Sequence, residues 1–184
     1  RWALVSEHIE GTTLDVLMEQ NPDKFDEYLN KFVEIQQTIH TKQVPLLNRI
    51  KEKYKRKINE VETLSDNTKY ELLQRLEGMK NHTKLCHGDF NPSNIIIDKD
   101  GGYHIIDWSH ATQGNASADV ARTYLLFTID GKKDVAEKYL DLFAQKSGIE
   151  KSYIQRWIPI VAATQMLKGK TEELELLSKW VDVK

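Results

Sequence analysis

Cysteine is almost absent from this sequence, since Cys86 is the only one among its 184 residues. One thiol cannot form a disulfide within the chain, which favours a reducing, cytoplasmic environment. Long apolar runs are also lacking, because no stretch approaches the roughly 20 apolar residues of a membrane-spanning helix. We therefore expect a cytoplasmic protein that does not associate with membranes.

Neither sign of charge is in excess. The chain has 26 Lys and Arg against 28 Asp and Glu, and the two signs are interleaved along the sequence. A nucleic-acid-binding protein would carry a clustered excess of positive charge, so we expect no nucleic-acid partner. Hydrophobic residues make up 40% of the chain, which is enough to fill the core of one globular domain.

Most of the chain has the spacing of apolar residues that is typical of amphipathic helices. Asn21 followed by Pro22 predicts a helix start, and Pro45 interrupts the run that follows. A second helix is expected over about residues 46–61, and Ser65 is expected to cap a third. The apolar stripes of the first and third helices are Phe25, Leu29, Phe32, Ile35 and Ile39, and Leu72, Leu73, Leu76 and Met79.

From residue 116 to the end of the chain the pattern is helical again. Gly131 and Gly148 divide this part, and Pro159 predicts a kink in one of its helices. Large aromatic residues at helical spacing are expected to lie in the core. They are Tyr139, Phe143, Trp157 and Trp180.

The middle of the chain differs, because two short β-rich runs lie close together there. Residues 94–98 and 103–108 predict two strands, and residues 99–102 (KDGG) predict the turn of a hairpin between them. We therefore expect an α+β fold that is mostly helical and carries one small β-hairpin.

Three oxygen-bearing side chains are expected to meet at the open end of this hairpin. Asn94 begins the first strand, Asp107 lies near the end of the second, and Asp89 lies in the loop before them. Amide and carboxylate oxygens are suitable ligands for Mg²⁺, which Asn94 and Asp107 would hold. Asp89 would then be free to orient a hydroxyl nucleophile and accept its proton. Phosphoryl transfer needs these parts.

Residues 87–94, HGDFNPSN, resemble the H-G-D-x-x-x-x-N catalytic loop of the aminoglycoside phosphotransferase-like family, which shares the protein-kinase fold. Residues 105–108, IIDW, are similar to the metal-binding motif of that family. The resemblance implies that Asp89 is the catalytic base or orienting group. It also implies that Asn94 and Asp107 bind Mg²⁺ together with ATP.

The resemblance extends to two further segments. Residues 3–11, ALVSEHIEG, look like the hinge between the two lobes of such an enzyme, and residues 2–5 are expected to form a strand. The hinge implies that the backbone near Glu7 and Ile9 contacts adenine. Residues 118–121, ADVA, resemble a later segment of the same family. The resemblance implies that Asp119 is a buried carboxylate that braces the catalytic loop.

We expect residues 1–12 to be the hinge and the end of a missing N-terminal lobe, and residues 13–184 to be the kinase-like C-terminal lobe. The resemblance implies an enzyme that transfers the γ-phosphate of ATP to a hydroxyl of a small molecule, an aminoglycoside or similar. The fragment alone is expected to be poorly active, because the Gly-rich loop and strand lysine would precede Arg1. The acceptor, the choice between ATP and GTP, and the oligomeric state are left open.

Two other functions are compatible with the same residues. One is a non-catalytic nucleotide-binding or regulatory module on the same scaffold, although such modules often lose one of the three site residues. The other is a metal-dependent hydrolase, which would need a denser cluster of carboxylates or histidines for two metal ions. Taken singly, Asp89, Asn94 and Asp107 could each be an ordinary turn residue.

Some other polar residues also have two interpretations. Cys86 could be a thiol nucleophile beside His87, but neighbours in an extended segment point in opposite directions, and His87 is expected to brace the loop. The basic run over residues 51–57 is interpreted as a solvated helix face, with an acidic partner as the alternative. The acidic residues within 172–175 are interpreted as solubilising, with a site for a polycationic acceptor as the alternative; they are Glu172, Glu173 and Glu175.

Overall fold

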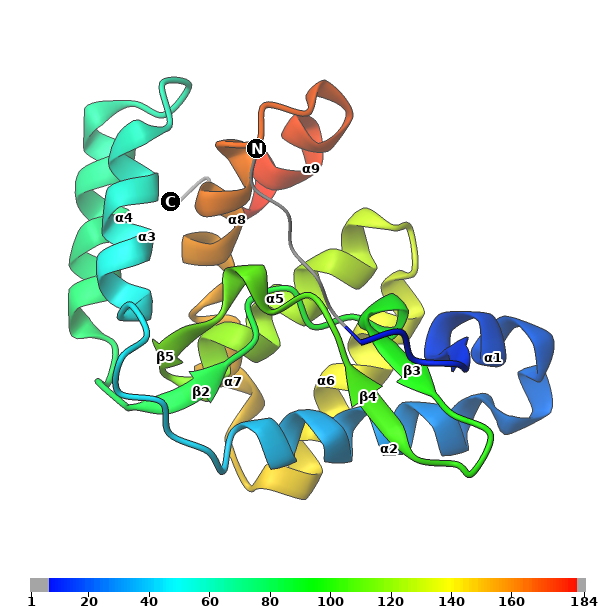
Figure 1. Ribbon diagram of the computed structural model, residues 1–184. Coiled ribbons are helices and arrows are strands. Elements are labelled where there is room, and N and C mark those ends of the chain that lie inside the picture. The colour runs from blue at the N-terminus through cyan, green and yellow to red at the C-terminus, as the bar shows by residue number, and fades with distance from the viewer. Residues whose placement is uncertain (1–6, 182–184) are drawn as a thin grey trace, which may run out of the picture.

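The computed structural model describes residues 7–181, which are mostly helical, as predicted (Figure 1). The strand expected over residues 2–5 lies outside this range. Within it the helices are α1 (Leu14–Gln20), α2 (Phe25–Ile39), α3 (Ile50–Glu60), α4 (Asp66–Gly78), α5 (Ala116–Ile129), α6 (Lys133–Ser147), α7 (Lys151–Gln155), α8 (Ile158–Met166) and α9 (Thr171–Val181). Short 3-10 helices cover Pro22–Lys24 (η1), Pro92–Asn94 (η2) and Trp108–His110 (η3). The strands are β1 (Thr12–Thr13), β2 (Lys84–Cys86), β3 (Ile95–Ile97), β4 (Tyr103–Ile105) and β5 (Thr112–Gly114).

The strands form two small antiparallel sheets. β3 and β4 form the predicted hairpin, with Ile95 opposite Ile105, and β1 pairs with the other edge of β3. β2 and β5 form a separate pair in which Leu85 lies opposite Gln113. The sequence analysis did not predict β1, β2 or β5, and each of them is at most three residues long.

The predicted apolar stripes are buried. In α2 the side chains of Leu29, Phe32, Ile35 and Ile39 are inaccessible to solvent or nearly so. In α4 Leu72 and Leu76 are buried, and the helix begins where predicted, because the Ser65 hydroxyl accepts a hydrogen bond from the Thr68 N–H (3.1 Å). The predicted core aromatics Tyr139, Phe143 and Trp157 are also buried, and Trp180 packs against the core.

Some predicted helix boundaries were confirmed and others were wrong. The helix start predicted at Asn21 and Pro22 is confirmed, since η1 begins at Pro22 and runs into α2, but the Asn21 side chain does not cap it. It donates instead to the Leu17 carbonyl (3.0 Å) at the end of α1, a helix that the sequence analysis missed. The second helix, α3, begins at Ile50 rather than near residue 46, because turns occupy the residues after Pro45. Pro159 lies in the first turn of α8, where a proline is tolerated, so it does not kink that helix.

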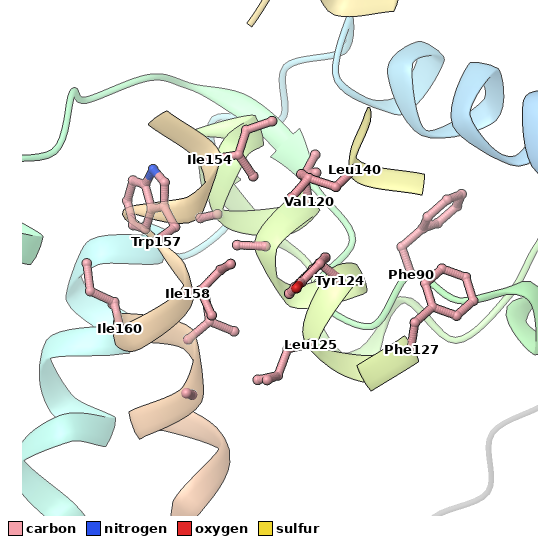
Figure 2. Packing of buried hydrophobic residues seen from close by; sticks show 14 of the residues in the cluster. Phe90, Val120, Tyr124, Leu125, Phe127, Leu140, Ile154, Trp157, Ile158 and Ile160 are labelled. Atoms are coloured by element: carbon pink, nitrogen blue, oxygen red, sulfur yellow. The ribbon is translucent and has the colours of Figure 1, made fainter. Parts of the chain in front are cut away.

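α5 lies at the centre of the core. It is buried along almost its whole length and packs against both α6 and α8. Figure 2 shows this core extending from Trp157 at one side, past Tyr124 of α5, to Phe127 and Phe90 at the other. Phe90 belongs to the loop between β2 and η2, so the loop that carries the candidate site is anchored in the main core. No helix within residues 7–181 is both long and apolar enough to cross a bilayer.

Candidate active site

The loop that carries Asp89 is held on both sides of this residue. On one side, the Gly88 N–H donates a hydrogen bond to Asp119 Oδ1 (2.7 Å). On the other side, the Phe90 carbonyl accepts a hydrogen bond from Thr123 Oγ1 (2.7 Å), and the Phe90 ring stacks on Phe32 with 4.5 Å between ring centroids. The backbone position of Asp89 is therefore fixed by α5 and by the core, while its side chain remains 23% exposed.

Asp119 is the buried carboxylate that the sequence analysis expected to brace the loop. Besides Gly88, it accepts hydrogen bonds from His40 Nε2 (2.9 Å) and, at 3.4 Å, from Gln36 Nε2, both in or directly after α2. Burial alone would raise the pKa of Asp119, but the hydrogen bonds from His40 and Gly88 outweigh that effect and lower it. An ionised Asp119 thus ties α2, α5 and the loop together.

His87 braces the loop, as predicted. Its Nε2 donates to the Ile106 carbonyl (3.0 Å), and its Nδ1 accepts from the Asp89 N–H (3.3 Å). These two contacts require the neutral tautomer with its proton on Nε2. The buried ring also packs against Trp108, with 4.7 Å between centroids. His87 therefore links the Asp89 loop to the strand end that carries Asp107.

The hairpin brings the three predicted site residues to one end of the sheet. The Asn94 amide group donates to the Asp89 carbonyl (2.9 Å) and, at 3.4 Å, to the Asp89 carboxylate. The Asn94 carbonyl accepts from the Ile106 N–H (3.0 Å), which places Asp107 one residue beyond this pair. Asn94 is thus in direct contact with Asp89, and the hairpin register sets Asp107 beside it.

Asp107 has an unusual backbone conformation. It is the one residue other than glycine with a positive φ between residues 7 and 181 (φ 57°, ψ 63°). Such conformations are costly and often occur at functional sites. Asp107 is exposed, and its Oδ1 accepts a hydrogen bond from Ser109 Oγ (2.6 Å), which lowers the pKa of Asp107 and keeps it ionised at neutral pH. A carboxylate is therefore presented to solvent at the hairpin end.

The donor set at the hairpin end fits Mg²⁺. Asn94 uses its NH₂ group towards Asp89, so its amide oxygen has no hydrogen-bond donor among the described residues. The Asp107 carboxylate accepts hydrogen bonds only from Ser109 among the described residues and is exposed, so it keeps lone pairs for a metal ion. One amide oxygen and one carboxylate leave most coordination positions to water and phosphate oxygens, which is how Mg²⁺ is commonly bound.

The predicted adenine contacts lie at the start of the described chain. Residues 7–10 are irregular, with Glu7 exposed and Ile9 half-buried. The next residue, Gly11, lies so close to β3 that a Cβ atom there would overlap the Ile97 carbonyl. The segment therefore runs past the hairpin, but no contact in the structure distinguishes Glu7 or Ile9 as a nucleotide-binding residue.

Sequence reasoning missed Arg122 and misassigned two lysines. The buried Arg122 side chain donates to Gln165 (2.6 Å) and lies 3.7 Å from Asp89 Oδ1. Lys53 and Lys57 were assigned to a solvated helix face, yet both are half-buried and line a recess next to Gly88. An arginine in the mostly buried helix α5, three residues after Asp119, was a signal that could have identified this side of the site.

Two other interpretations are also decided by the structure. Glu173 is buried and accepts hydrogen bonds from Gln165 and Lys170, and Glu175 pairs with Lys179 on its own helix. These carboxylates are occupied by neighbours and do not form a joint acidic site. The Cys86 thiol is buried, and burial raises its pKa well above the ordinary value, which makes it a poor nucleophile.

Comparisons with known proteins identify a family and a shared fold. Residues 2–151 match the sequence model of the phosphotransferase enzyme family. A search of curated protein sequences gives no match. Among solved structures, the choline kinase LicA from Streptococcus pneumoniae is 19% identical with a TM-score of 0.60, over 83% of this chain and 62% of that one.

Two further structures have a similar fold. LicA in complex with AMP is 18% identical with a TM-score of 0.63, over 95% of this chain and 67% of that one. A thermostable mutant of the aminoglycoside phosphotransferase APH(4)-Ia, in its apo form, is 15% identical with a TM-score of 0.68, over 96% and 69% respectively. The chain thus spans about two thirds of the length of these structures, and the likeness shows a shared fold.

Proposed function

Because the chain belongs to the phosphotransferase enzyme family, we propose that its full-length protein transfers the γ-phosphate of ATP to a hydroxyl group of a small molecule. The observation that carries the proposal is the placement of Asp89. Its backbone is fixed by Asp119 and by the buried Phe90, while its carboxylate stays accessible beside Asn94. A rigid, accessible carboxylate next to a Mg²⁺-compatible donor set is suited to orient a hydroxyl nucleophile.

The chain's own residues would divide the work as follows. Asp89 would align the acceptor hydroxyl and take its proton as the oxygen attacks the γ-phosphorus. Asn94 and Asp107 would hold Mg²⁺, which neutralises phosphate charge when bound. His87 would keep the Asp89 loop and the Asp107 strand end in register through its two hydrogen bonds.

A nucleotide between the hinge and the hairpin is part of the same proposal. The AMP complex of LicA supports it, since that structure shares this fold. Glu7 and Ile9 remain predicted contacts for adenine, and the boundary at residue 12 between hinge and C-terminal lobe remains a prediction. We propose ATP as the phosphate donor and Mg²⁺ as the metal.

The test is ATP consumption by the full-length protein with Mg²⁺ and a panel of small hydroxyl compounds. Asp89→Asn is expected to lower the turnover number by about 10²- to 10⁴-fold, because the group that orients and deprotonates the hydroxyl is lost. The stability of this variant is expected to stay within about 1 kcal/mol of wild type, since only 3.4 and 3.7 Å contacts reach the carboxylate.

Asp100→Asn is a matched control, because Asp100 is an exposed aspartate in the turn of the same hairpin. It is expected to keep wild-type turnover. Wild-type turnover in Asp89→Asn would contradict the assigned role of Asp89. No turnover by the wild-type protein with any acceptor would instead favour a non-catalytic nucleotide-binding module.

A further inference from the structure

A recess beside Asp89 is lined by cationic side chains. It lies between α3, α5 and α8, next to Gly88, and its enclosed part is small, about 30 Å³, so that a ligand group would sit mainly at its mouth. Lys53 and Lys57 come from α3, Arg122 from α5, and Lys168 directly follows α8. Arg122 connects the recess to the candidate site, because its Nη2 lies 3.7 Å from Asp89 Oδ1.

Two of these cations have no partner in the described part of the chain. The ammonium groups of Lys57 and Lys168 make no hydrogen bond with residues 7–181, and no carboxylate in that range lies within 4 Å of either one. Lys53 differs, since it donates to the His110 carbonyl (2.9 Å). Lys57 is half-buried and Lys168 is exposed at the mouth of the recess, and both ammonium groups keep hydrogen-bonding capacity for a ligand.

No carboxylate of the described residues lines the recess. Glu173 is buried and occupied by Gln165 and Lys170, and Asp119 is occupied by Gly88 and His40. Asp89 approaches the lining through Arg122, and the charges of Glu60 and Glu173 act on Lys57 and Lys168 from outside the lining. The recess therefore has an excess of positive charge, although the net charge of the whole chain is −2.

Burial, and to a smaller extent the repulsion from neighbouring cations, lowers the pKa of the three lysines of the recess. Burial, together with the charges of Lys57 and Arg122, lowers the pKa of Lys53 to about 8. Burial and the charge of Arg122 also lower the pKa of Lys57 and Lys168. An anion placed among these groups would relieve the repulsion, whereas a cation would increase it.

We propose that the acceptor is an anionic hydroxyl compound, whose carboxylate or phosphate ester binds Lys57 and Lys168 while its hydroxyl reaches Asp89. This inference rests on the proposed function and names its substrate class. In the reaction, the acceptor oxygen forms a bond to the γ-phosphorus and the bond from that phosphorus to the β–γ bridging oxygen breaks. The hydroxyl proton passes to Asp89, and ADP leaves with the electron pair of the broken bond.

The phosphates of ATP are the other anions that these lysines could bind. The fold argues against them, because Figure 1 shows α3 and α8 to one side of α5 and the hairpin of β3 and β4 to the other. The Mg²⁺-compatible donors Asn94 and Asp107 are at the hairpin and do not line the recess, although His110, three residues after Asp107, does. If the acceptor binds in the recess, the Michaelis constant for the acceptor depends on Lys57. If the phosphates of ATP bind there, the Michaelis constant for ATP depends on it instead.

The experiment compares acceptors that share one carbon skeleton, with the full-length protein and saturating Mg·ATP. Glycerol is the neutral acceptor, glycerate the carboxylate and glycerol 3-phosphate the phosphate ester, and choline provides a cationic acceptor. We expect turnover of at least one of the two anionic acceptors with a kcat/KM well above that of glycerol or choline. Preference between glycerate and glycerol 3-phosphate would identify which anion the recess accepts.

Lys57→Gln tests the assignment, since the Lys57 ammonium has no described partner whose loss would weaken the fold. Loss of one charge-assisted hydrogen bond is expected to raise KM for the anionic acceptor about tenfold and to leave KM for ATP unchanged. Lys55→Gln is the matched control, because it removes the same charge from the exposed face of α3. It is expected to change neither constant.

The outcomes separate this inference from the proposed function. Turnover of only glycerol or choline, unaffected by Lys57→Gln, would overturn the inference and leave the proposed function standing. A tenfold rise in KM for ATP would also overturn it, by placing nucleotide phosphates in the recess. If no acceptor turns over, calorimetry with glycerate and glycerol 3-phosphate decides: binding that Lys57→Gln weakens supports an anion site, and no binding overturns it.

Discussion

Gly88 and Gly101 have nearly the same backbone conformation but very different surroundings. Their φ angles are +83° and +79°, in the left-handed region that disfavours other residues. A Cβ at Gly88 would lie 2.5 Å from the His110 carbonyl oxygen, whereas a Cβ at Gly101 would meet nothing within 4 Å. Substitutions at the two positions therefore distinguish the energetic cost of a left-handed backbone conformation from the cost of a steric clash.

We expect Gly101→Ala to lower the free energy of unfolding by about 1 kcal/mol, which is the cost of the left-handed conformation alone. Gly88→Ala is expected to lower it by about 3 kcal/mol, because the loop must also move away from His110. Denaturant unfolding measures both. Gly88→Ala should also reduce turnover, since the movement displaces Asp89. Equal losses of stability in the two variants would contradict the close packing of this loop.

Asp119 is the residue whose loss is expected to be most damaging outside the reacting groups. Asp119→Ala would leave the Gly88 N–H and the buried His40 without their acceptor, at a cost of about 3 kcal/mol. The pKa of Asp119 is lowered on folding, so its contribution is complete above the unfolded value near 3.8 and is lost as the pH falls towards the folded value. The difference between wild type and variant in urea unfolding should therefore shrink in acid.

Asp119→Asn is the conservative comparison, because an amide oxygen can still accept from the Gly88 N–H. It is expected to cost less than Asp119→Ala and to keep more activity. If both variants were as stable as wild type at pH 7, the carboxylate would not brace the loop.

Individual site residues could be predicted to different degrees. A local feature, the β3–β4 hairpin, was enough to predict that Asp89, Asn94 and Asp107 lie close together. The register of the hairpin brings the end of β4 back to the start of β3, and the structure places the three residues at that end. The burial of Lys53 and Lys57 in α3 depends instead on which helix packs beside them. That helix, α8, is about a hundred residues away in the chain. No local pattern specifies such a partner.

Among the secondary-structure elements, α4 was predicted best, because its start has a local chemical cause. The Ser65 hydroxyl accepts from the Thr68 N–H at 3.1 Å, and α4 packs against α3. Ser65→Ala is expected to lower the free energy of unfolding by about 1 kcal/mol, the usual cost of a lost N-cap. Acceptor and nucleotide Michaelis constants should not change, because Ser65 is exposed and is not among the residues that line the recess. A much larger loss of stability would mean that α4 folds only with its cap.

The elements that sequence analysis missed have little local cause. β2 and β5 are three residues each, and Lys84 finds its partner Gly114 thirty positions later. α1 is seven residues long and has no side-chain hydrogen bond at its N-cap. Isolated segments this short are not stable in water, so their structure comes from tertiary packing. The same holds for the surroundings of α3. Lys53 and Lys57 lie beside the buried stripe of this helix, and nothing in the local sequence indicates that α8 packs against that side.

For the whole molecule, the contrast between an overall charge of −2 and a cationic recess predicts an effect of salt. Raising the ionic strength from about 0.01 M to about 0.1 M shortens the Debye length from about 30 Å to about 10 Å. We expect kcat/KM for an anionic acceptor to fall severalfold over this range at saturating Mg·ATP. Glycerol is the neutral control, and an equal fall for glycerol would mean that salt acts elsewhere on the enzyme.

The hydrogen bonds of Asp119 also bear on how the molecule opens. Loops around an active site usually exchange their amide hydrogens through small local fluctuations. Here the Gly88 amide is bonded to a carboxylate that is shared with α2, so we expect its hydrogen to exchange with deuterium more slowly than the amides of the exposed hairpin turn. A loop tied in this way to the helix and the core would offer substrates a site that changes little in shape when they bind.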